Sequence, residues 1–249
     1  MKPPTERPLA TTVSARSSLA GKHRPRLRIS GFGFLVALVL WLGAGPFVRN
    51  LKAGQLCEAV LFTLVMCTGL VASGSRRRTN RLALSLVSLA VTTHWLNQLW
   101  PQRCPALAYM LPAMAFLVVI IASLLGFILR VKQVDADVLC AGISVYLILG
   151  VFWGLAYTLV AQLIPNAFSF STAPGTTATM SGFTATYFSF ITLTTVGYGD
   201  ITPAADTARM LAVLEATTGT LFVGVLIARL VSVYSTSAQN HSNPHGTIR

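Results

Sequence analysis

Charged side chains are scarce in this sequence, and acidic ones are the scarcest. Only 10% of its 249 residues are charged, and seven of these are aspartate or glutamate. Soluble domains carry about 25% charged residues, so the composition excludes an ordinary soluble protein. The hydrophobic share of 53% and the mean hydropathy of +0.65 indicate a membrane protein instead.

Cysteine and histidine are also few, with four residues of each. Cys57 and Cys67 lie in one apolar stretch, Cys140 lies in another, and Cys104 lies in a loop. We therefore expect packed free thiols and no disulfide framework. No CxxC or His/Cys cluster is present, and no nucleophile, base and orienting group converge. The sequence predicts no metal centre of such ligands, no cofactor and no enzyme activity.

Six apolar stretches account for most of the chain. A helix needs roughly 20 apolar residues to cross a hydrocarbon core about 30 Å thick, and most of the stretches are that long. We predict an all-α membrane protein with six transmembrane helices, at residues 31–48, 55–72, 82–100, 106–129, 138–163 and 210–234.

Lysine and arginine are concentrated in alternate loops, which sets the predicted orientation. They precede the first stretch, as in Arg24 and Arg28, and they separate the second stretch from the third and the fourth from the fifth, as in Arg77 and Arg130. Because cytoplasmic loops carry the excess of positive residues, both termini are predicted to be cytoplasmic. The same distribution explains the net charge of +12 without nucleic acid as a partner.

Residues 1–30 are basic and rich in Pro, Ser and Thr. This composition predicts a disordered cytoplasmic tail that contacts anionic lipid. A cleavable signal peptide with residues 31–44 as its apolar region is the alternative, although the basic part is long for one. Residues 237–249 are expected to be a second, short cytoplasmic tail.

A short polar motif lies between the last two stretches and consists of Thr194, Thr195, Val196, Gly197, Tyr198, Gly199 and Asp200. Neighbouring carbonyls of a regular strand point in opposite directions, so a loop that points them all to one axis needs some residues at positive φ. Gly197 and Gly199 reach that region at little steric cost. Val196 and Tyr198 are then expected to turn their side chains away from the axis.

This motif, the preceding run 187–193 and the following Ile201-Thr202-Pro203 resemble the pore helix and selectivity filter of the tetrameric potassium channel family. The resemblance covers the last two stretches and implies that backbone carbonyls bind K⁺ at Thr195, Val196, Gly197 and Tyr198, with Gly199 completing the filter. It also implies a homotetramer, because one filter strand cannot surround an ion. A polar turn after a helix is the plain alternative.

Residues beside the motif are predicted to support it. Ser181 is a candidate cap for a short re-entrant helix over 182–193, whose carbonyl end at Thr194 favours a cation. The resemblance places Tyr187 and Phe188 in an aromatic belt that braces Tyr198.

Two carboxylates are further candidates for filter support. Asp200 either attracts cations to the mouth or accepts hydrogen bonds from the pore helix, and the second role is favoured. Glu215 is an ionisable residue within a membrane helix, which marks it as a functional candidate. It either accepts a hydrogen bond from Ser189 or Thr192 behind the filter or couples to an ion or proton.

The last stretch contains two glycines and an arginine. Gly219 resembles the hinge of the family's inner helix, whereas Gly224 is expected only to ease packing. Arg229 is expected to reach toward the membrane interface.

The first four stretches lack a voltage sensor. Residues 106–129 contain no lysine or arginine, whereas a voltage-sensing helix carries several gating charges. We therefore predict weak voltage dependence at most. Glu58 and His94 are the ionisable residues well inside this half; we expect Glu58 at the interface, and His94 either titrates or simply packs.

The sequence thus predicts a four-helix domain at 31–132 and an ion-channel pore domain at 133–236. The expected function is passive, selective potassium conduction in a cell membrane, with K⁺ as the permeant ligand. A cation channel of relaxed selectivity and a non-conducting regulatory subunit are the alternatives.

Overall fold

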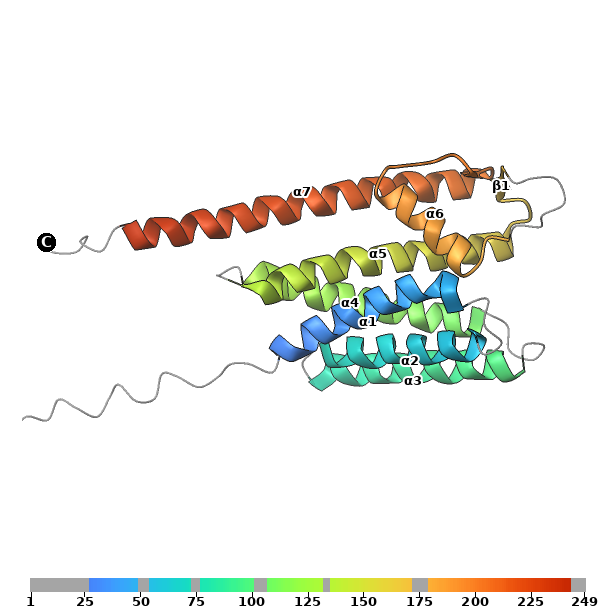
Figure 1. Cartoon of the computed structure of the whole chain (residues 1–249), viewed down its shortest axis with the longest axis horizontal. Coiled ribbons are helices and arrows are strands. Elements are labelled where there is room, and N and C mark those ends of the chain that lie inside the picture. The colour runs from blue at the N-terminus through green and yellow to red at the C-terminus, as the bar shows by residue number, and fades with distance from the viewer. Residues whose placement is uncertain are drawn as a thin grey trace, which may run out of the picture.

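The fold is mostly helical. A computed structural model describes residues 27–48, 54–72, 77–100, 107–131, 135–171 and 179–242. The first half of the chain forms four helices, each over one of the predicted apolar stretches (Figure 1): α1 (Leu27–Val48), α2 (Gly54–Ala72), α3 (Arg77–Leu99) and α4 (Leu107–Arg130). The prediction of helices in this half is confirmed.

The second half begins with α5 (Ala136–Leu163) and ends with the long helix α7 (Asp206–Ser242). Between them lie β1 (Phe168–Phe170), the short helix α6 (Phe183–Leu193) and β2 (Ile201–Pro203). The two strands pair antiparallel, with Ser169 opposite Thr202. The all-α prediction missed this sheet because strands of three residues carry too little alternation to be recognised.

Among the described residues, three helices are long and apolar enough to cross a membrane: α4, α5 and residues 206–232 of α7. Shorter apolar runs lie at Gly31–Gly45 in α1 and Leu56–Ala72 in α2, and α6 is a third. In α3 the apolar pattern is interrupted by residues such as His94 and Asn97. By length and composition the structure supports half of the six predicted spans.

Two predicted boundaries need correction. Helix α1 already begins at Leu27, within the segment predicted to be disordered, and α7 continues to Ser242 through the start of the predicted second tail. Neither extension contains proline or glycine, so nothing interrupts the helical hydrogen bonds there. Several predicted features lie outside the described residues. They are residues 1–26 and 243–249, Cys104, and Pro174-Gly175, a pair that predicts a turn.

Helix α5 is the central element of the fold (Figure 1). It packs against α1 and α4 on one side and against α6 and α7 on the other. One buried apolar cluster joins α1–α4 to the first part of α5, through residues such as Phe34, Phe116 and Ile148. A second cluster surrounds the end of α5 and α6, with Tyr157 and Phe188 at its centre.

Helix α7 is far less covered than α5. Its apolar side chains Met210, Leu221 and Val231 are each more than 60% exposed in the single chain, at 62%, 61% and 61%. Contiguous exposed apolar surface of this kind marks contact with lipid or with another protein. The described chain therefore leaves a long apolar face of α7 open.

Candidate functional site

The filter motif begins where α6 ends. Its preceding helix starts at Phe183, with Gly182 as the N-cap at φ 52° and no side-chain cap. The predicted cap by Ser181 is therefore wrong, because Gly182 and not Ser181 occupies the N-cap position. Thr194 is the C-cap of α6, and its backbone N–H donates to the carbonyl of Phe190.

Backbone N–H groups of the motif are bonded to the end of α6. The N–H groups of Val196 and Gly197 both donate to the carbonyl of Ile191, at 2.9 and 3.1 Å, and that of Thr195 donates to Thr192 at 2.9 Å. These carbonyls are among the last four of a helix, which have no partner within it. The motif thus caps α6, and α6 in turn fixes the path of the motif.

Positive φ alternates along the motif. Thr195, Gly197 and Gly199 have φ of 59°, 52° and 81°. The two glycines were predicted to take this conformation, but Thr195 was not. A β-branched residue at positive φ costs about 1–3 kcal/mol and persists only where the surroundings hold it. Here its N–H bond to Thr192 supplies that constraint.

The carbonyls of the motif are free within the described chain. None of the residues Thr195 to Gly199 accepts a backbone hydrogen bond from another described residue. Such polar groups need water, a donor or a cation. Val196 and Tyr198 are 52% and 72% exposed, so both residues remain largely accessible in the single chain.

Asp200, at the carboxyl end of the motif, is hydrogen-bonded to α6 and to the segment that follows α5. The Tyr187 hydroxyl donates to Oδ2 of Asp200 at 2.9 Å, which agrees with the favoured role of Asp200 as an acceptor for the pore helix. The Asp200 carbonyl accepts the N–H of Ser171 at 2.8 Å, next to the β1–β2 pair. Asp200 therefore links α6 to the segment that follows α5.

Glu215 lies fully buried behind α6 and accepts two hydrogen bonds. Ser189 Oγ donates to its Oε1 and the Tyr157 hydroxyl donates to its Oε2, both at 2.5 Å. The Ser189 hydroxyl also lies 2.6 Å from the carbonyl of Gly150, and its one hydrogen serves one oxygen at a time. The carboxylate thus joins α5, α6 and α7 at one point.

Two predictions about these partners need revision. Thr192, the other candidate donor to Glu215, instead donates to the carbonyl of Phe188, because its hydroxyl points back along its own helix. Tyr157 was not predicted as a partner. It lies in a different apolar stretch, and no local pattern connects it with Glu215.

Phe188 does not brace Tyr198 within the chain. Its ring contacts those of Tyr157 and Phe168 edge-on, at centroid distances of 4.8 and 5.6 Å, and it is almost fully buried. The neighbouring Tyr187 points to the other side of α6 and stacks on Phe183 at 6.4 Å. Consecutive helical residues face about 100° apart, so the two rings have different neighbours within the described chain; their bracing of Tyr198 in an assembly stays a prediction.

Gly219 allows α7 to approach the end of α6 closely. A Cβ atom built on Gly219 would lie 2.5 Å from the carbonyl oxygen of Leu193, whereas one on Gly224 would meet nothing within 4 Å. Helix α7 is continuous through both positions. The structure therefore gives Gly219 a packing role next to the filter; its role as a hinge stays a prediction.

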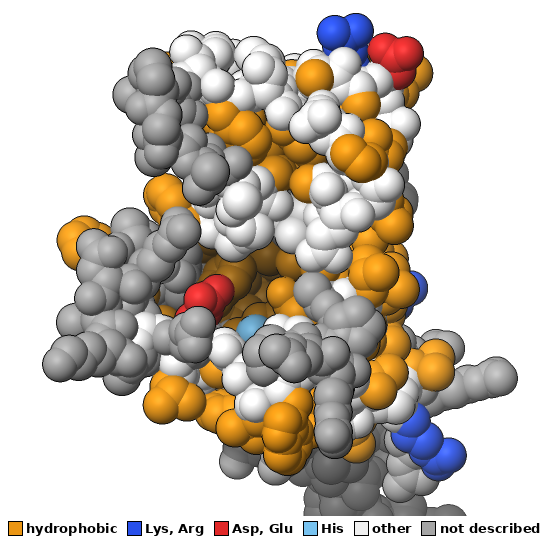
Figure 2. Space-filling view, turned by 90° about the vertical axis from the view of Figure 1, so that its right-hand side faces the viewer, with side chains coloured by type: hydrophobic (Ala, Val, Ile, Leu, Met, Phe, Trp, Pro, Cys, Tyr) orange, Lys and Arg blue, Asp and Glu red, His pale blue; other side chains and the backbone are white. Residues whose placement is uncertain are grey.

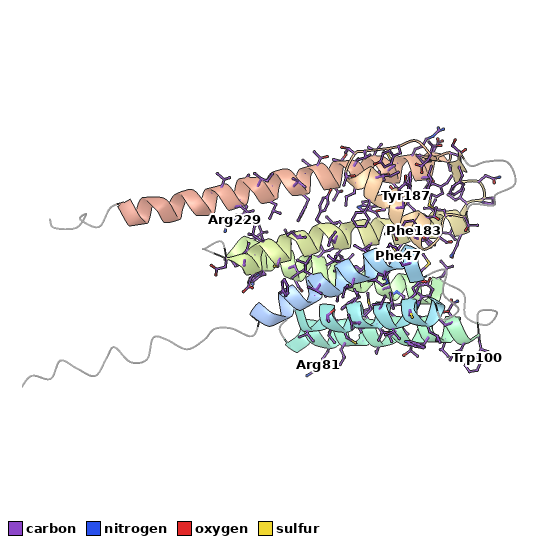
Figure 3. All side chains as sticks on the ribbon, in the orientation of Figure 1. Phe47, Arg81, Trp100, Phe183, Tyr187 and Arg229 are labelled. Atoms are coloured by element: carbon purple, nitrogen blue, oxygen red, sulfur yellow. The ribbon has the colours of Figure 1, made fainter. Side chains whose placement is uncertain are left out.

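Arg229 connects α7 to the end of α4 instead of reaching outward alone. Its Nη2 donates to the carbonyls of Leu129 and Val131, at 3.1 and 3.0 Å. These carbonyls end a helix and would otherwise be unpaired. Arg229 lies far along α7 from Tyr187 and Phe183 (Figure 3), so α7 is anchored both near the filter motif and far from it.

A loop of free carbonyls at the carboxyl end of a short helix, held between two long apolar helices, is an arrangement suited to an ion-conducting pore. Residues 143–236 match the model of a family described as ion channel. The match covers α6, the filter motif and most of α5 and α7, and it indicates an ion-channel domain rather than an enzyme.

Curated relatives agree with this class. A 48-residue segment is 46% identical to "Two-pore potassium channel 4" of Arabidopsis thaliana, covering 19% of this chain and 17% of that protein. Over 88 residues the chain is 35% identical to "Two pore potassium channel c" of Oryza sativa subsp. japonica, covering 33% of this chain and 19% of the relative. The chain thus spans about a fifth of the length of these relatives. No solved structure matched the chain.

Proposed function

We propose that this protein is the subunit of a homotetrameric potassium channel that conducts K⁺ passively and selectively. The carbonyls of Thr195, Val196, Gly197 and Tyr198 coordinate the ion, and Gly199 keeps the outer end of the filter open. The choice of K⁺ as the ion rests on the names of the two relatives, which are both called potassium channels.

The free, outward-facing filter carries this proposal. The N–H groups of Thr195, Val196 and Gly197 are bonded to α6, while the carbonyls of the motif have no backbone donor in the described chain. A dehydrated cation needs a ring of such carbonyls to replace its hydration shell, and one loop provides only a segment of the ring. Four copies around one axis close it, and cyclic symmetry is the usual form of homo-oligomers.

The proposal also includes a placement of the helices in the membrane. In the proposal six helices cross a cell membrane, α6 and the filter re-enter from the outer side, and both termini are cytoplasmic. Non-helical backbone at membrane depth is tolerated where it lines a watery cavity. Residues 133–236 form the pore domain, and residues 31–132 form the four-helix domain beside it.

Steep voltage gating is not part of the proposed function. Moving one charge across 100 mV yields about 2.3 kcal/mol, and residues 107–129 of α4 contain no lysine or arginine. Residues Thr194, Tyr187, Phe188, Asp200 and Glu215 support the filter, and Gly219 permits the inner helix to move.

The test is ion flux through purified protein in liposomes, with reversal potentials in mixed K⁺ and Na⁺. We expect K⁺ flux that prefers K⁺ over Na⁺ and varies little with voltage. Gly197→Ala should abolish it, because alanine is strained at φ 52°. Gly224→Ala is the matched control, since its added methyl meets nothing within 4 Å.

Each outcome separates the candidates. Absence of flux in the native protein means a non-conducting subunit, and equal permeability to K⁺ and Na⁺ means a cation channel of relaxed selectivity. Chemical cross-linking in the same liposomes reports the oligomer: a ladder that stops at three copies contradicts the proposed tetramer.

A further inference from the structure

A large cavity lies between the four-helix domain and the start of α6. Its volume is about 520 Å³, within the range of small-molecule sites, roughly 300–1,000 Å³. Side chains of α1, α2, α3, α4 and α5 line it, together with Phe183 and Thr186 of α6. Figure 2 shows it as a hollow on the end of the molecule that carries the filter, with acidic and histidine side chains visible in it.

His94 is the unusual polar residue of this cavity. It is 8% exposed, and neither Nδ1 nor Nε2 has a hydrogen-bond partner in the described structure. Its ring lies between those of Phe62 and Tyr109, at centroid distances of 4.5 and 5.0 Å. A buried polar group without a partner costs about 1–3 kcal/mol, so a water molecule or a ligand that hydrogen-bonds to this imidazole would be stabilised there.

The charge in the cavity is negative. Glu58 lines it, and the described lining contains no lysine or arginine to pair with that carboxylate. Aromatic side chains, including Trp41 and Phe62, form much of the wall. A carboxylate, an acceptor nitrogen and aromatic faces each favour a cation with N–H groups, while the apolar remainder of the wall favours a hydrocarbon body.

We infer that this cavity is a binding site for an apolar organic cation, an amine with aromatic or aliphatic arms. The ammonium group donates to Glu58 and to a ring nitrogen of His94, and its arms fill the space between α1, α2 and α5. Because Phe183 and Thr186 belong to the first turn of α6, the bound molecule touches the helix that holds the filter. Binding therefore changes ion flow, a consequence that rests on the proposed function.

Dibenzylamine and its neutral counterpart dibenzyl ether test the site, because they have nearly the same shape and differ in charge. Equilibrium dialysis of the full chain in detergent, corrected with protein-free micelles, measures binding directly. We expect saturable binding of the amine that Glu58→Gln weakens about tenfold, and weaker binding of the ether that Glu58→Gln leaves unchanged. Equal affinities of native protein and Glu58→Gln for the amine overturn the proposal, as does ether binding as strong as amine binding.

Two glycines of α1 provide a second, matched pair of variants. A Cβ on Gly45, which lines the cavity, would lie 3.8 Å from the Phe183 ring, whereas one on the exposed Gly43 would meet nothing within 4 Å. Gly45→Leu should fill the cavity and abolish binding, and Gly43→Leu should bind like the native protein. Unchanged binding in Gly45→Leu places the amine elsewhere and refutes the site.

Flux measurements then test the link to α6. We expect dibenzylamine to change K⁺ flux of the native protein and to have little effect on Glu58→Gln at the same concentration. An equal change in both means that the amine acts in the pore itself, which contradicts the link. If the native protein shows no flux without the amine, the proposed function fails, while dialysis still decides whether the site exists.

Discussion

Two buried polar groups, one in each half of the molecule, have opposite hydrogen-bonding environments. In the pore half, both carboxylate oxygens of Glu215 are bonded, to Ser189 and Tyr157. In the four-helix half, both ring nitrogens of His94 are unpartnered in the described structure and line a cavity. A satisfied network fixes the position of helices, whereas an unsatisfied group beside open space is available to a ligand.

Packing differs between the halves in the same sense. Gly219 lets α7 contact the backbone of α6, while Gly45 faces the cavity with only a ring at ordinary contact distance. The contact at Gly219 therefore holds α6 and α7 in one geometry, whereas the cavity beside Gly45 has room for a ligand. Four pairs of substitutions test this contrast. Each pair has one member in each half, and in the last pair the expected effects on stability differ in sign.

The largest effect is expected for Glu215→Ala. It leaves the Tyr157 hydroxyl without its acceptor, leaves Ser189 with only the Gly150 carbonyl, and opens a cavity, which should destabilise the protein by about 2–4 kcal/mol. Glu58→Ala, at an exposed glutamate, should leave the thermal unfolding midpoint in detergent unchanged. Similar midpoints for the two variants would remove Glu215 from its structural role.

Gly219→Ala should have the next largest effect. The added methyl would overlap the Leu193 carbonyl oxygen, and overpacking of this kind costs about 1–3 kcal/mol. Displacement of α6 should also reduce K⁺ flux. Gly45→Ala is the control, because its methyl enters open space. Native flux and stability in Gly219→Ala would mean that α7 moves aside without disturbing the filter.

Tyr157→Phe isolates a single hydrogen bond. Loss of the donor to Oε2 of Glu215 should cost about 1–2 kcal/mol, measured as a lower unfolding midpoint. Tyr109→Phe makes the same chemical change at the wall of the cavity, where the hydroxyl has no partner among the described residues, and should shift the midpoint little. A larger shift for Tyr109→Phe would reverse the contrast between the halves.

His94→Phe should have the smallest effect and the opposite sign. Replacing an unpartnered buried imidazole by an apolar ring is nearly neutral or stabilising, by less than about 1 kcal/mol. Ser189→Ala, which removes a bonded hydroxyl, should destabilise by about 1 kcal/mol. A marked loss of stability in His94→Phe would show that the imidazole is bonded after all.

The helices and the filter motif could be predicted from the sequence because both are local. Apolar stretches locate the helices, and Gly197 and Gly199 mark the positions that need positive φ. Proximity of Ser189 to Glu215 could be proposed because one precedes and the other follows the motif. Such features depend on neighbours along the chain or on one turn of helix.

Features that depend on distant segments were not predictable. Tyr157 reaches Glu215 only because α5 and α7 pack together, and β1 meets β2 only after the chain has passed through α6. Thr195 is a local exception: it adopts positive φ against its own preference, and its N–H is bonded to Thr192 only three residues earlier. Phe188 faces the core because of the rotation of α6, which apolar composition on all sides does not specify.

The shared carbonyl of Ile191 has a mechanical consequence. Because the N–H groups of Val196 and Gly197 both donate to this one oxygen, a small shift or rotation of Ile191 displaces two adjacent peptide units of the motif together. In the channel proposed above, such a shift would change the width of the filter without any bend in α7.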